Sequence, residues 1–213
     1  MKTRKQFPPF VRLDIPVDLS RLQADYDRLI PISHQHGEFH DKPRHSFIPL
    51  THIDPNGPID QSSWVGTISN RAYKGVTPGV TRNRNPLEND RNHNRVFEWA
   101  KSSYAIELAG QLGDFCKIAY STIKPGGFLP THIDFDPSNA YKVNICVRTG
   151  PESESAVWNH EQQRVELFHL QEGEACFLNT GRAHAAFNWD QVERTFLLIA
   201  FRNQEVHRYA CSS

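Results

Sequence analysis

The sequence has few of the features that mark secreted, membrane-spanning or nucleic-acid-binding proteins. Its 24 basic and 24 acidic side chains leave no formal net charge, which argues against a nucleic-acid partner recognised through a broad basic surface. No apolar run approaches the roughly 18 residues that a membrane span needs. Residues 1–5 are basic, but the apolar stretch of a signal peptide does not follow them. We therefore expect a soluble, cytoplasmic protein that binds neither nucleic acid nor a membrane.

Cysteine is scarce as well. The four cysteines are widely spaced and form no C-x-x-C pair, and they lie at Cys116, Cys146, Cys176 and Cys211. Three of them lie in apolar, strand-like runs, so the pattern favours buried, reduced thiols over disulfides. Reduced thiols agree with the expected cytoplasmic location.

The chain is long enough for a sizeable core, and its two halves differ in pattern. A length of 213 residues suits one compact domain over residues 1–213. Residues 1–114 predict a layer of helices and loops, with helices over 18–30 and 97–112. The polar stretch 81–95 has no apolar periodicity and predicts a long loop, which is either a floppy connection or a functional lid.

Residues 115–202 carry short apolar runs separated by glycine- and proline-rich turns. These runs predict strands over residues 115–123, 128–135, 141–148, 164–170, 174–178, 182–189 and 195–201. The last run is almost wholly apolar, as expected of a strand that is buried on both faces. Many short strands with tight turns indicate a mainly β fold with flanking helices, built on a double-stranded β-helix (a jelly-roll, cupin-like core).

A His-x-Asp motif, His132-Ile133-Asp134, is the most informative pattern in the chain. In a strand, residues i and i+2 point to the same face, so His132 and Asp134 would project side by side. Two imidazoles and one carboxylate form the facial triad that holds Fe(II) and leaves coordination positions open. With a second histidine from elsewhere, the motif predicts a metal centre that can also bind a co-substrate and dioxygen.

The tetrapeptide Thr-His-Ile-Asp occurs twice, at residues 51–54 and 131–134. With 11 histidines in the chain, one such motif can arise by chance. The first copy runs directly into a Pro-Asn-Gly-Pro turn. Its nearest downstream histidine is His93, and ten residues beyond lies Ser103, where a basic residue would be wanted. We therefore assign the metal site to the second copy.

The second copy is followed by His184 and, ten residues later, by Arg194. Strands and turns between residues 135 and 183 allow the chain to fold back, so His184 is the predicted third ligand. Arg194 would begin the next strand and offer a planar, bidentate guanidinium to one end of a dicarboxylate co-substrate. The alternative for Arg194 alone is an arginine that snorkels at the end of a strand.

These residues, within GGFLPTHIDFD and GEACFLNTGRAHAAFNWDQVERTFLLIAF, resemble the core of the aspartyl/asparaginyl β-hydroxylase superfamily. The similarity is closest to small, soluble bacterial members such as the proline cis-3-hydroxylases, and it covers about residues 115–201. The resemblance implies an Fe(II)- and 2-oxoglutarate-dependent dioxygenase that uses O2 and releases succinate and CO2. It also implies that His132, Asp134 and His184 bind iron and that Arg194 binds the far carboxylate of 2-oxoglutarate.

Two departures from the family qualify the resemblance. The animal aspartyl hydroxylases lack the acidic ligand, whereas this chain has Asp134 and so resembles the soluble branch. Those enzymes also place a basic residue nine positions after the first histidine; here Tyr141 occupies that position and Lys142 follows it. The retained acid also argues against a halogenase, which needs that coordination position for halide.

Candidate substrate-binding residues are Lys142, Asn144 and Arg148, which alternate along one strand, and Trp158. The face that Lys142, Asn144 and Arg148 share would either line the pocket and bind a substrate carboxylate or remain solvated. Trp158 is a candidate for the pocket wall.

We expect the substrate to be a small amino acid or a derivative of one. Two alternatives stay open: hydroxylation of Asp or Asn side chains in a peptide or protein, and a non-enzymatic jelly-roll protein that binds a metal. The close-spaced three-histidine, one-glutamate pattern of metal-binding cupins is absent from the sequence. The oligomeric state does not follow from the sequence.

Overall fold

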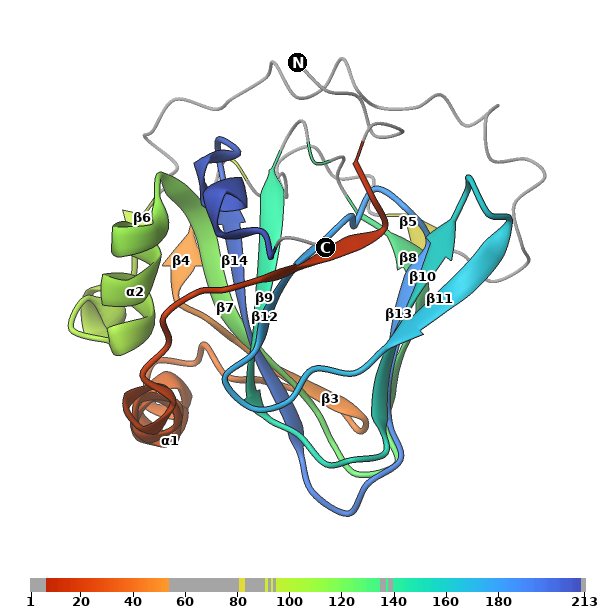
Figure 1. The fold of residues 1–213 in the computed structure, drawn as a ribbon. Helices are drawn as coiled ribbons and strands as arrows, with labels where there is room; N and C mark the ends of the chain where they lie inside the picture. Colours follow the sequence, from red (N-terminus) through yellow and green to blue (C-terminus); the bar gives the residue numbers. More distant parts are fainter. Residues whose placement is uncertain are drawn as a thin grey trace.

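Two β-sheets face each other, and two α-helices cover the outer side of the larger one (Figure 1). The structure is a computed structural model that describes residues 7–53, 81–82, 91, 93, 95–134, 137 and 140–211. This architecture confirms the predicted mainly β fold with flanking helices and a jelly-roll-like core. No helix in these described ranges is long and apolar enough to cross a membrane.

The larger sheet has seven strands in the order β1-β12-β9-β14-β7-β3-β2. Their bounds are Phe10–Leu13 (β1), Ala175–Leu178 (β12), Tyr141–Arg148 (β9), Arg194–Phe201 (β14), Phe115–Ile123 (β7), His45–Pro49 (β3) and His40–Asp41 (β2). All of the pairings between neighbours in this sheet are antiparallel.

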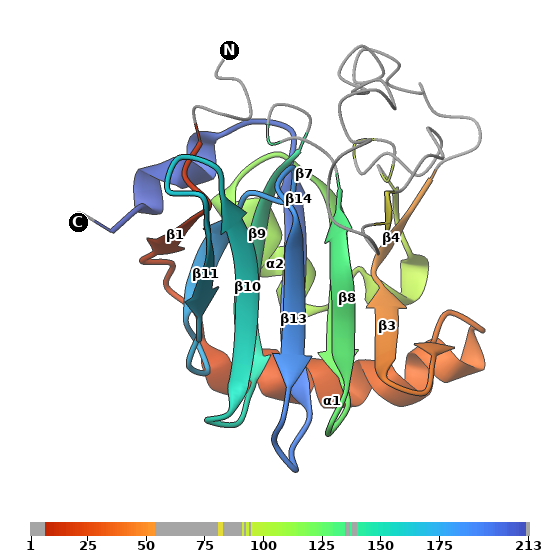
Figure 2. The ribbon, with the colours of Figure 1, turned by 90° about the vertical axis from the view of Figure 1, so that its right-hand side faces the viewer.

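The smaller sheet has five strands in the order β11-β10-β13-β8-β5, and Figure 2 shows β10, β13 and β8 face on. Their bounds are Arg164–Phe168 (β11), Ser153–Asn159 (β10), His184–Asn188 (β13), Phe128–Ile133 (β8) and Thr81–Arg82 (β5). A separate two-stranded ladder joins Thr51–His52 (β4) to Arg95–Val96 (β6).

Both α-helices begin at a side-chain cap. Helix α1 (Leu19–Gln35) starts after Asp18, whose side chain accepts a hydrogen bond from the N–H of Arg21. Helix α2 (Tyr104–Leu112) starts after Ser103, which accepts from the N–H of Ile106. The predicted helix over 97–112 is therefore wrong at its start, because Ser103 caps a new helix. Only a 3-10 turn, η6 (Glu98–Ala100), precedes it, and a second turn, η7 (Glu205–Tyr209), follows β14.

The N-terminal part contributes more β structure than expected. Strands β1, β2 and β3 join the larger sheet, so residues 1–114 are not only a layer of helices and loops. Their runs are short and broken by polar residues, so they lack the strong alternation that marks the later strands. The stretch 81–95 also begins and ends in short strands, β5 and β6, while most of its interior lies outside the described residues.

The two faces of strand β14 contribute to different parts of the molecule. Thr195, Leu197, Ile199 and Phe201 face the helices, where Leu197, Ile199 and Phe201 join the main core with Leu22 and other helix residues. The alternate residues face the smaller sheet and line a cavity at Arg194, Phe196, Leu198 and Ala200. A second apolar cluster between the sheets, which includes Phe196, closes one side of this space. The cavity is thus the inside of the jelly roll.

Candidate active site

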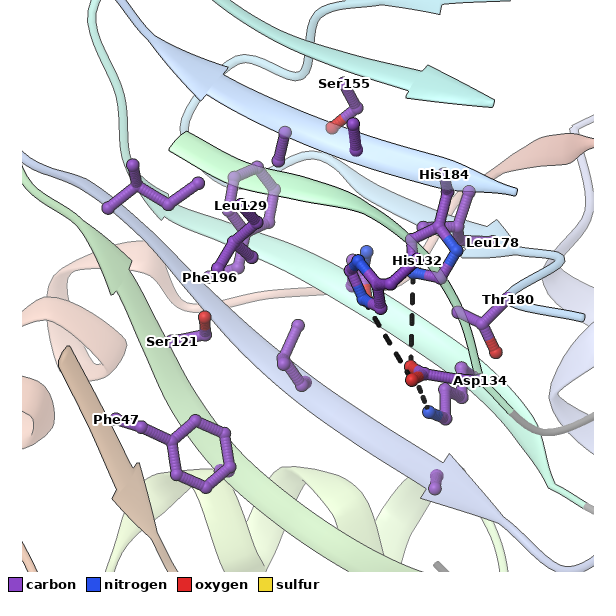
Figure 3. A pocket seen from close by; sticks show the side chains of 18 of the residues that line it. Phe47, Ser121, Leu129, His132, Asp134, Ser155, Leu178, Thr180, His184 and Phe196 are labelled. Atoms are coloured by element: carbon purple, nitrogen blue, oxygen red, sulfur yellow. Dashed lines mark hydrogen bonds and ion pairs between the residues drawn. The ribbon is translucent and has the colours of Figure 1, made fainter. Parts of the chain in front are cut away.

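His132, Asp134 and His184 come together at one end of the cavity between the sheets (Figure 3). His132 on β8 pairs directly with His184 on β13, so the two rings lie side by side with centroids 4.1 Å apart. Asp134 follows β8, and its N–H donates to the carbonyl of Thr180 at 2.9 Å. One potential ligand atom from each of the three side chains lies within 4.8 Å of the others.

The ring orientation of both histidines suits metal binding. Nδ1 of His132 lies 2.8 Å from the carbonyl oxygen of Pro130, and Nδ1 of His184 lies 3.0 Å from that of Arg182. A carbonyl only accepts, so each Nδ1 carries the proton, and each Nε2 in the neutral ring keeps its lone pair. Both Nε2 atoms face Asp134, at 4.0 Å from Oδ1 for His132 and 4.0 Å from Oδ2 for His184.

The donor set fits a divalent transition metal. Two imidazole nitrogens and one carboxylate oxygen are the ligands of the facial triad that binds non-haem Fe(II). Backbone carbonyls that fix the Nδ1 proton are the usual outer partners of metal-binding histidines. Three protein ligands leave further coordination positions open, whereas a purely structural site closes its ligand set.

Burial and a neighbouring lysine set the charges of this group. Burial lowers the pKa of His184 to about 4, so the ring is neutral and ready to donate its lone pair at neutral pH. Burial alone would raise the pKa of Asp134, but Lys142 and the two histidines outweigh it and hold the pKa below its usual value. Nζ of Lys142 lies 2.9 Å from Oδ2 of Asp134. The site therefore holds the Asp134 carboxylate and a neutral imidazole at His184.

Arg194 lies in the same cavity, and only 2% of the residue is exposed. Its guanidinium donates to the carbonyl of Glu154 at 2.7 Å and to Oγ of Ser155 at 2.6 Å. Among the described residues, no acceptor meets its Nε, which is buried. Burial lowers the pKa of Arg194 to about 10, so the group stays charged at neutral pH. The charge and the unused donor together are suited to binding a carboxylate.

The cavity has a volume of about 210 Å³, and its walls are largely apolar. Leu129, Leu178 and Phe196 are among the apolar residues that line it, and Figure 3 shows Leu178 beside the two histidines. Apolar walls limit water around the triad and strengthen the electrostatic interactions inside the cavity.

The predicted substrate-binding residues divide into two groups. Lys142 and Asn144 line the cavity, as the alternation along β9 suggests. Arg148 does not: the pairing of β9 with β14 skips Val147, and this irregularity breaks the alternation before Arg148. Its guanidinium instead lies 2.6 Å from Oδ2 of Asp27 on helix α1.

Trp158 also lies outside the cavity. Its neighbour Val157 on β10 belongs to the apolar cluster between the sheets, so Trp158 points the opposite way. It forms an edge contact with His160 at 6.3 Å between ring centroids. Trp158 was expected in the pocket wall, but it lies on the face of β10 that points away from the cavity.

Two polar residues of the cavity wall, Ser155 and Lys117, were not among the predicted site residues. Ser155 was not identified because β10 carries mixed polar and apolar residues and was not predicted as a strand. Lys117 lies on β7, whose bounds were predicted, and alternation along that strand places residues 117, 119, 121 and 123 on one face. The alternation along β7 could therefore have identified Lys117 as a residue of the cavity wall.

The first Thr-His-Ile-Asp copy has different surroundings. His52 stacks on Phe97 with ring centroids 4.5 Å apart, and Thr51 accepts a hydrogen bond from the N–H of Ile118. Asp54 lies outside the described residues. Among the described residues, the only group of three or more possible metal ligands is the one formed by the second copy.

No protein-family model matches the chain, and no curated protein matches it in sequence. Among solved structures, a Pseudomonas putida prolyl-4-hydroxylase is similar, with a TM-score of 0.46, 14% identity and coverage of 92% of this chain and 94% of that chain. An oxidoreductase of the 2OG-Fe(II) oxygenase family from Burkholderia pseudomallei is also similar, with a TM-score of 0.42 and 11% identity. The similarity covers 92% of this chain and 95% of that chain.

An oxalate oxidase is similar over a smaller region, with a TM-score of 0.33, 19% identity and coverage of 39% of this chain. The chain spans only 40% of the length of that oxalate oxidase.

Proposed function

We propose that the protein is an Fe(II)- and 2-oxoglutarate-dependent dioxygenase that hydroxylates a small amino acid or a derivative of one. The convergence of His132, Asp134 and His184 with Arg194 in one cavity is the observation that carries this proposal. Succinate and CO2 are the expected co-products. The resemblance of the two motif segments to the aspartyl/asparaginyl β-hydroxylase superfamily supports the same assignment.

The three ligand residues would hold a metal from one wall of the cavity. His132 and His184 present Nε2, and Asp134 presents a carboxylate oxygen, all from the wall formed by the smaller sheet and its following turn. Lys142 engages Oδ2 of Asp134, which favours coordination through the other oxygen. When bound there, iron would activate O2, which is the oxidant, and 2-oxoglutarate would supply two of the four electrons that reduce it.

Arg194 holds and orients the co-substrate. Its guanidinium is fixed by the carbonyl of Glu154 and by Ser155, so little side-chain entropy is lost when a carboxylate binds. A carboxylate would also give the buried Nε the acceptor that it lacks. A molecule that spans the cavity would place one carboxylate at Arg194 and its other end at the triad. A short dicarboxylate has this shape.

The apolar walls of the cavity limit contact with water on one side of the triad only. Leu129, Leu178 and Phe196 line the cavity, while the side chains of His132 and Asp134 remain 26% and 29% exposed. Exclusion of water directs oxidation toward the bound substrate rather than toward side reactions.

Anaerobic addition of Fe(II) and 2-oxoglutarate to the protein tests the proposal. We expect a weak metal-to-ligand charge-transfer band in the visible region, which requires both molecules to bind at one centre. His132→Ala should abolish the band, and Arg194→Ala should weaken it at a fixed 2-oxoglutarate concentration.

Arg148→Ala is the matched control, because Arg148 lies outside the cavity beside Asp27. It should leave the band unchanged. Circular dichroism would verify that each variant is folded. The proposal fails if the folded parent protein gives no band.

A further inference from the structure

The strands at the borders of the seven- and five-stranded sheets differ in how their outer edges are protected. The C-terminal segment covers β1: the N–H of Asp14 donates to the carbonyl of Tyr209 at 2.7 Å, and the N–H of Cys211 donates to that of Arg12 at 3.1 Å. Strands β2 and β5, at two other borders, have only two residues each. Covered edges and very short edge strands protect a sheet against pairing with another chain.

Strand β11 is the fourth border strand, and among the described residues no other strand pairs with its outer edge. Figure 2 shows it beside β10, its one partner strand. Its five residues include neither lysine nor proline, which commonly protect an edge. Val165 and Leu167 are instead 53% and 58% exposed. An exposed edge strand with apolar side chains is a surface to which a further strand can add.

The apolar side chains of β11 continue a stripe across the outer face of the smaller sheet. Val165 pairs with Trp158 of β10, and Leu167 pairs with Ala156. Residues paired across antiparallel strands point to the same face, and Trp158 lies on the face that points away from the cavity. The stripe therefore reaches the outer edge of β11, where an added strand would cover its end.

The charges of β11 favour a second copy of this chain as the added strand. Arg164 and Glu166 have opposite charges and lie two residues apart, so they share the face opposite to Val165. A twofold axis at Val165 would pair two β11 strands antiparallel, with Arg164 of each copy opposite Glu166 of the other. Opposite charges at directly paired positions stabilise antiparallel strands. The strand is therefore complementary to itself.

Neighbouring registers fit less well. An axis at Glu166 would place two carboxylates directly opposite each other, which is destabilising. An axis at Leu167 would require Val165 to pair with His169, whose carbonyl oxygen already accepts a hydrogen bond from Arg12 of β1 at 2.8 Å. The axis at Val165 avoids both problems.

We propose that two copies of this chain associate through their β11 strands, which joins two five-stranded sheets into one continuous sheet. The same surface serves both copies, so the association closes at a dimer. The shared ladder is short, which places the interface among the weak ones that bury less than about 1,200 Å². Association through β11 does not depend on metal binding or on the proposed reaction.

Sedimentation equilibrium of the purified protein over about 1–300 µM tests the proposal in the range that suits a weak interface. We expect the mean mass to rise from that of a monomer toward that of a dimer. Val165→Lys places an ammonium group at the twofold axis and should raise the dissociation constant by at least about 10-fold. Val192→Lys is the matched control, because Val192 is also 53% exposed but lies between β13 and β14. It should leave the constant unchanged.

An exchange of charges tests the register. Arg164→Glu and Glu166→Arg each leave a strand with two charges of one sign, so each variant alone should be mainly monomeric. In an equimolar mixture, opposite charges would face each other at every paired position, and a mixed dimer should form. The double variant Arg164→Glu/Glu166→Arg should recover the dimer for the same reason.

Circular dichroism would verify that each variant is folded. Any one of three results would overturn the proposal. The first is a parent protein that stays monomeric at every concentration, and the second is a dimer that Val165→Lys leaves intact. The third is a mixture of the two single charge variants that remains monomeric while the parent dimerises.

Discussion

The two Thr-His-Ile-Asp segments show how one tetrapeptide acquires different roles in one fold. In the first copy, Thr51–His52 forms the short strand β4, which pairs with β6 away from the cavity, and His52 packs on Phe97. In the second copy, His132 lies on β8 between two partner strands, and His184 is directly opposite it. The tetrapeptide offers the same side chains in both places, and the neighbouring strands decide whether they form a site.

The positions downstream of each copy differ in the same way. Ten residues after His184 lies Arg194, which is buried and faces the cavity. Ten residues after His93 lies Ser103, whose side chain caps helix α2. A histidine followed ten residues later by a polar residue therefore indicates a binding site only when both side chains reach the space that the His-x-Asp segment faces.

Removing the histidine from each copy should give the largest contrast. His132→Ala deletes one of three ligands, and we expect Fe(II) affinity to fall by more than about 100-fold, beyond the usual cost of losing an outer partner of a ligand. His52→Ala should leave the affinity unchanged. Competition with a chelator under anaerobic conditions measures both, and equal losses in the two variants would contradict the assignment.

The downstream positions provide the next contrast. Arg194→Met should weaken 2-oxoglutarate binding by about 100-fold, because two charge-assisted hydrogen bonds are lost, while Fe(II) affinity is retained. Ser103→Ala should leave 2-oxoglutarate binding unchanged and lower the free energy of unfolding by about 1 kcal/mol through loss of the helix cap. Calorimetry and denaturant titration separate the two effects. Unchanged 2-oxoglutarate binding in Arg194→Met would remove Arg194 from the site.

A smaller effect is expected at Ser155, a positioning residue for Arg194. Ser155→Ala removes the acceptor that lies 2.6 Å from the guanidinium, so 2-oxoglutarate affinity should fall by about 5- to 10-fold with Fe(II) affinity unchanged. Ser153→Ala is a matched control on the same strand, since Oγ of Ser153 contacts Asn188 instead. A similar fall in both variants would indicate a general effect on β10.

The smallest expected effect is on the pH dependence of stability without metal. The pKa of His184 is about 4 in the folded protein and near 6.5 when unfolded, so the unfolded chain binds more protons as the pH falls below 6.5. Between pH 7 and pH 5.5 the parent should therefore lose about 1 kcal/mol more unfolding free energy than His184→Gln. Denaturant titrations at both pH values would show it. Identical losses would mean that the folded protein does not hold His184 neutral.

The regular parts of the fold could be predicted from the sequence. The bounds of β7 and β9 were predicted as the structure has them, because both strands are long and strongly apolar on at least one face. Strands β1 and β3 were missed because they are short, and β10, which has 7 residues, was missed because its polar and apolar residues are mixed. Strands β1 and β3 gain their stability from partners that are distant in the sequence, β12 and β7, which local patterns do not encode.

The candidate site shows the same division. The spacing of His132 and Asp134 on a predicted strand was enough to identify them as a pair, and Arg194 was found from its distance to His184. Alternation also placed Lys142 and Asn144 correctly on the cavity side. It failed at Arg148, because an irregularity in strand pairing depends on the partner strand rather than on the local sequence.

An anaerobic crystal structure with Fe(II) and 2-oxoglutarate tests the central claim most directly. We predict a single anomalous iron peak bounded by Nε2 of His132, Nε2 of His184 and a carboxylate oxygen of Asp134. We also predict that the far carboxylate of 2-oxoglutarate lies within hydrogen-bond distance of Arg194. Iron at His52, or 2-oxoglutarate bound away from Arg194, would contradict the claim.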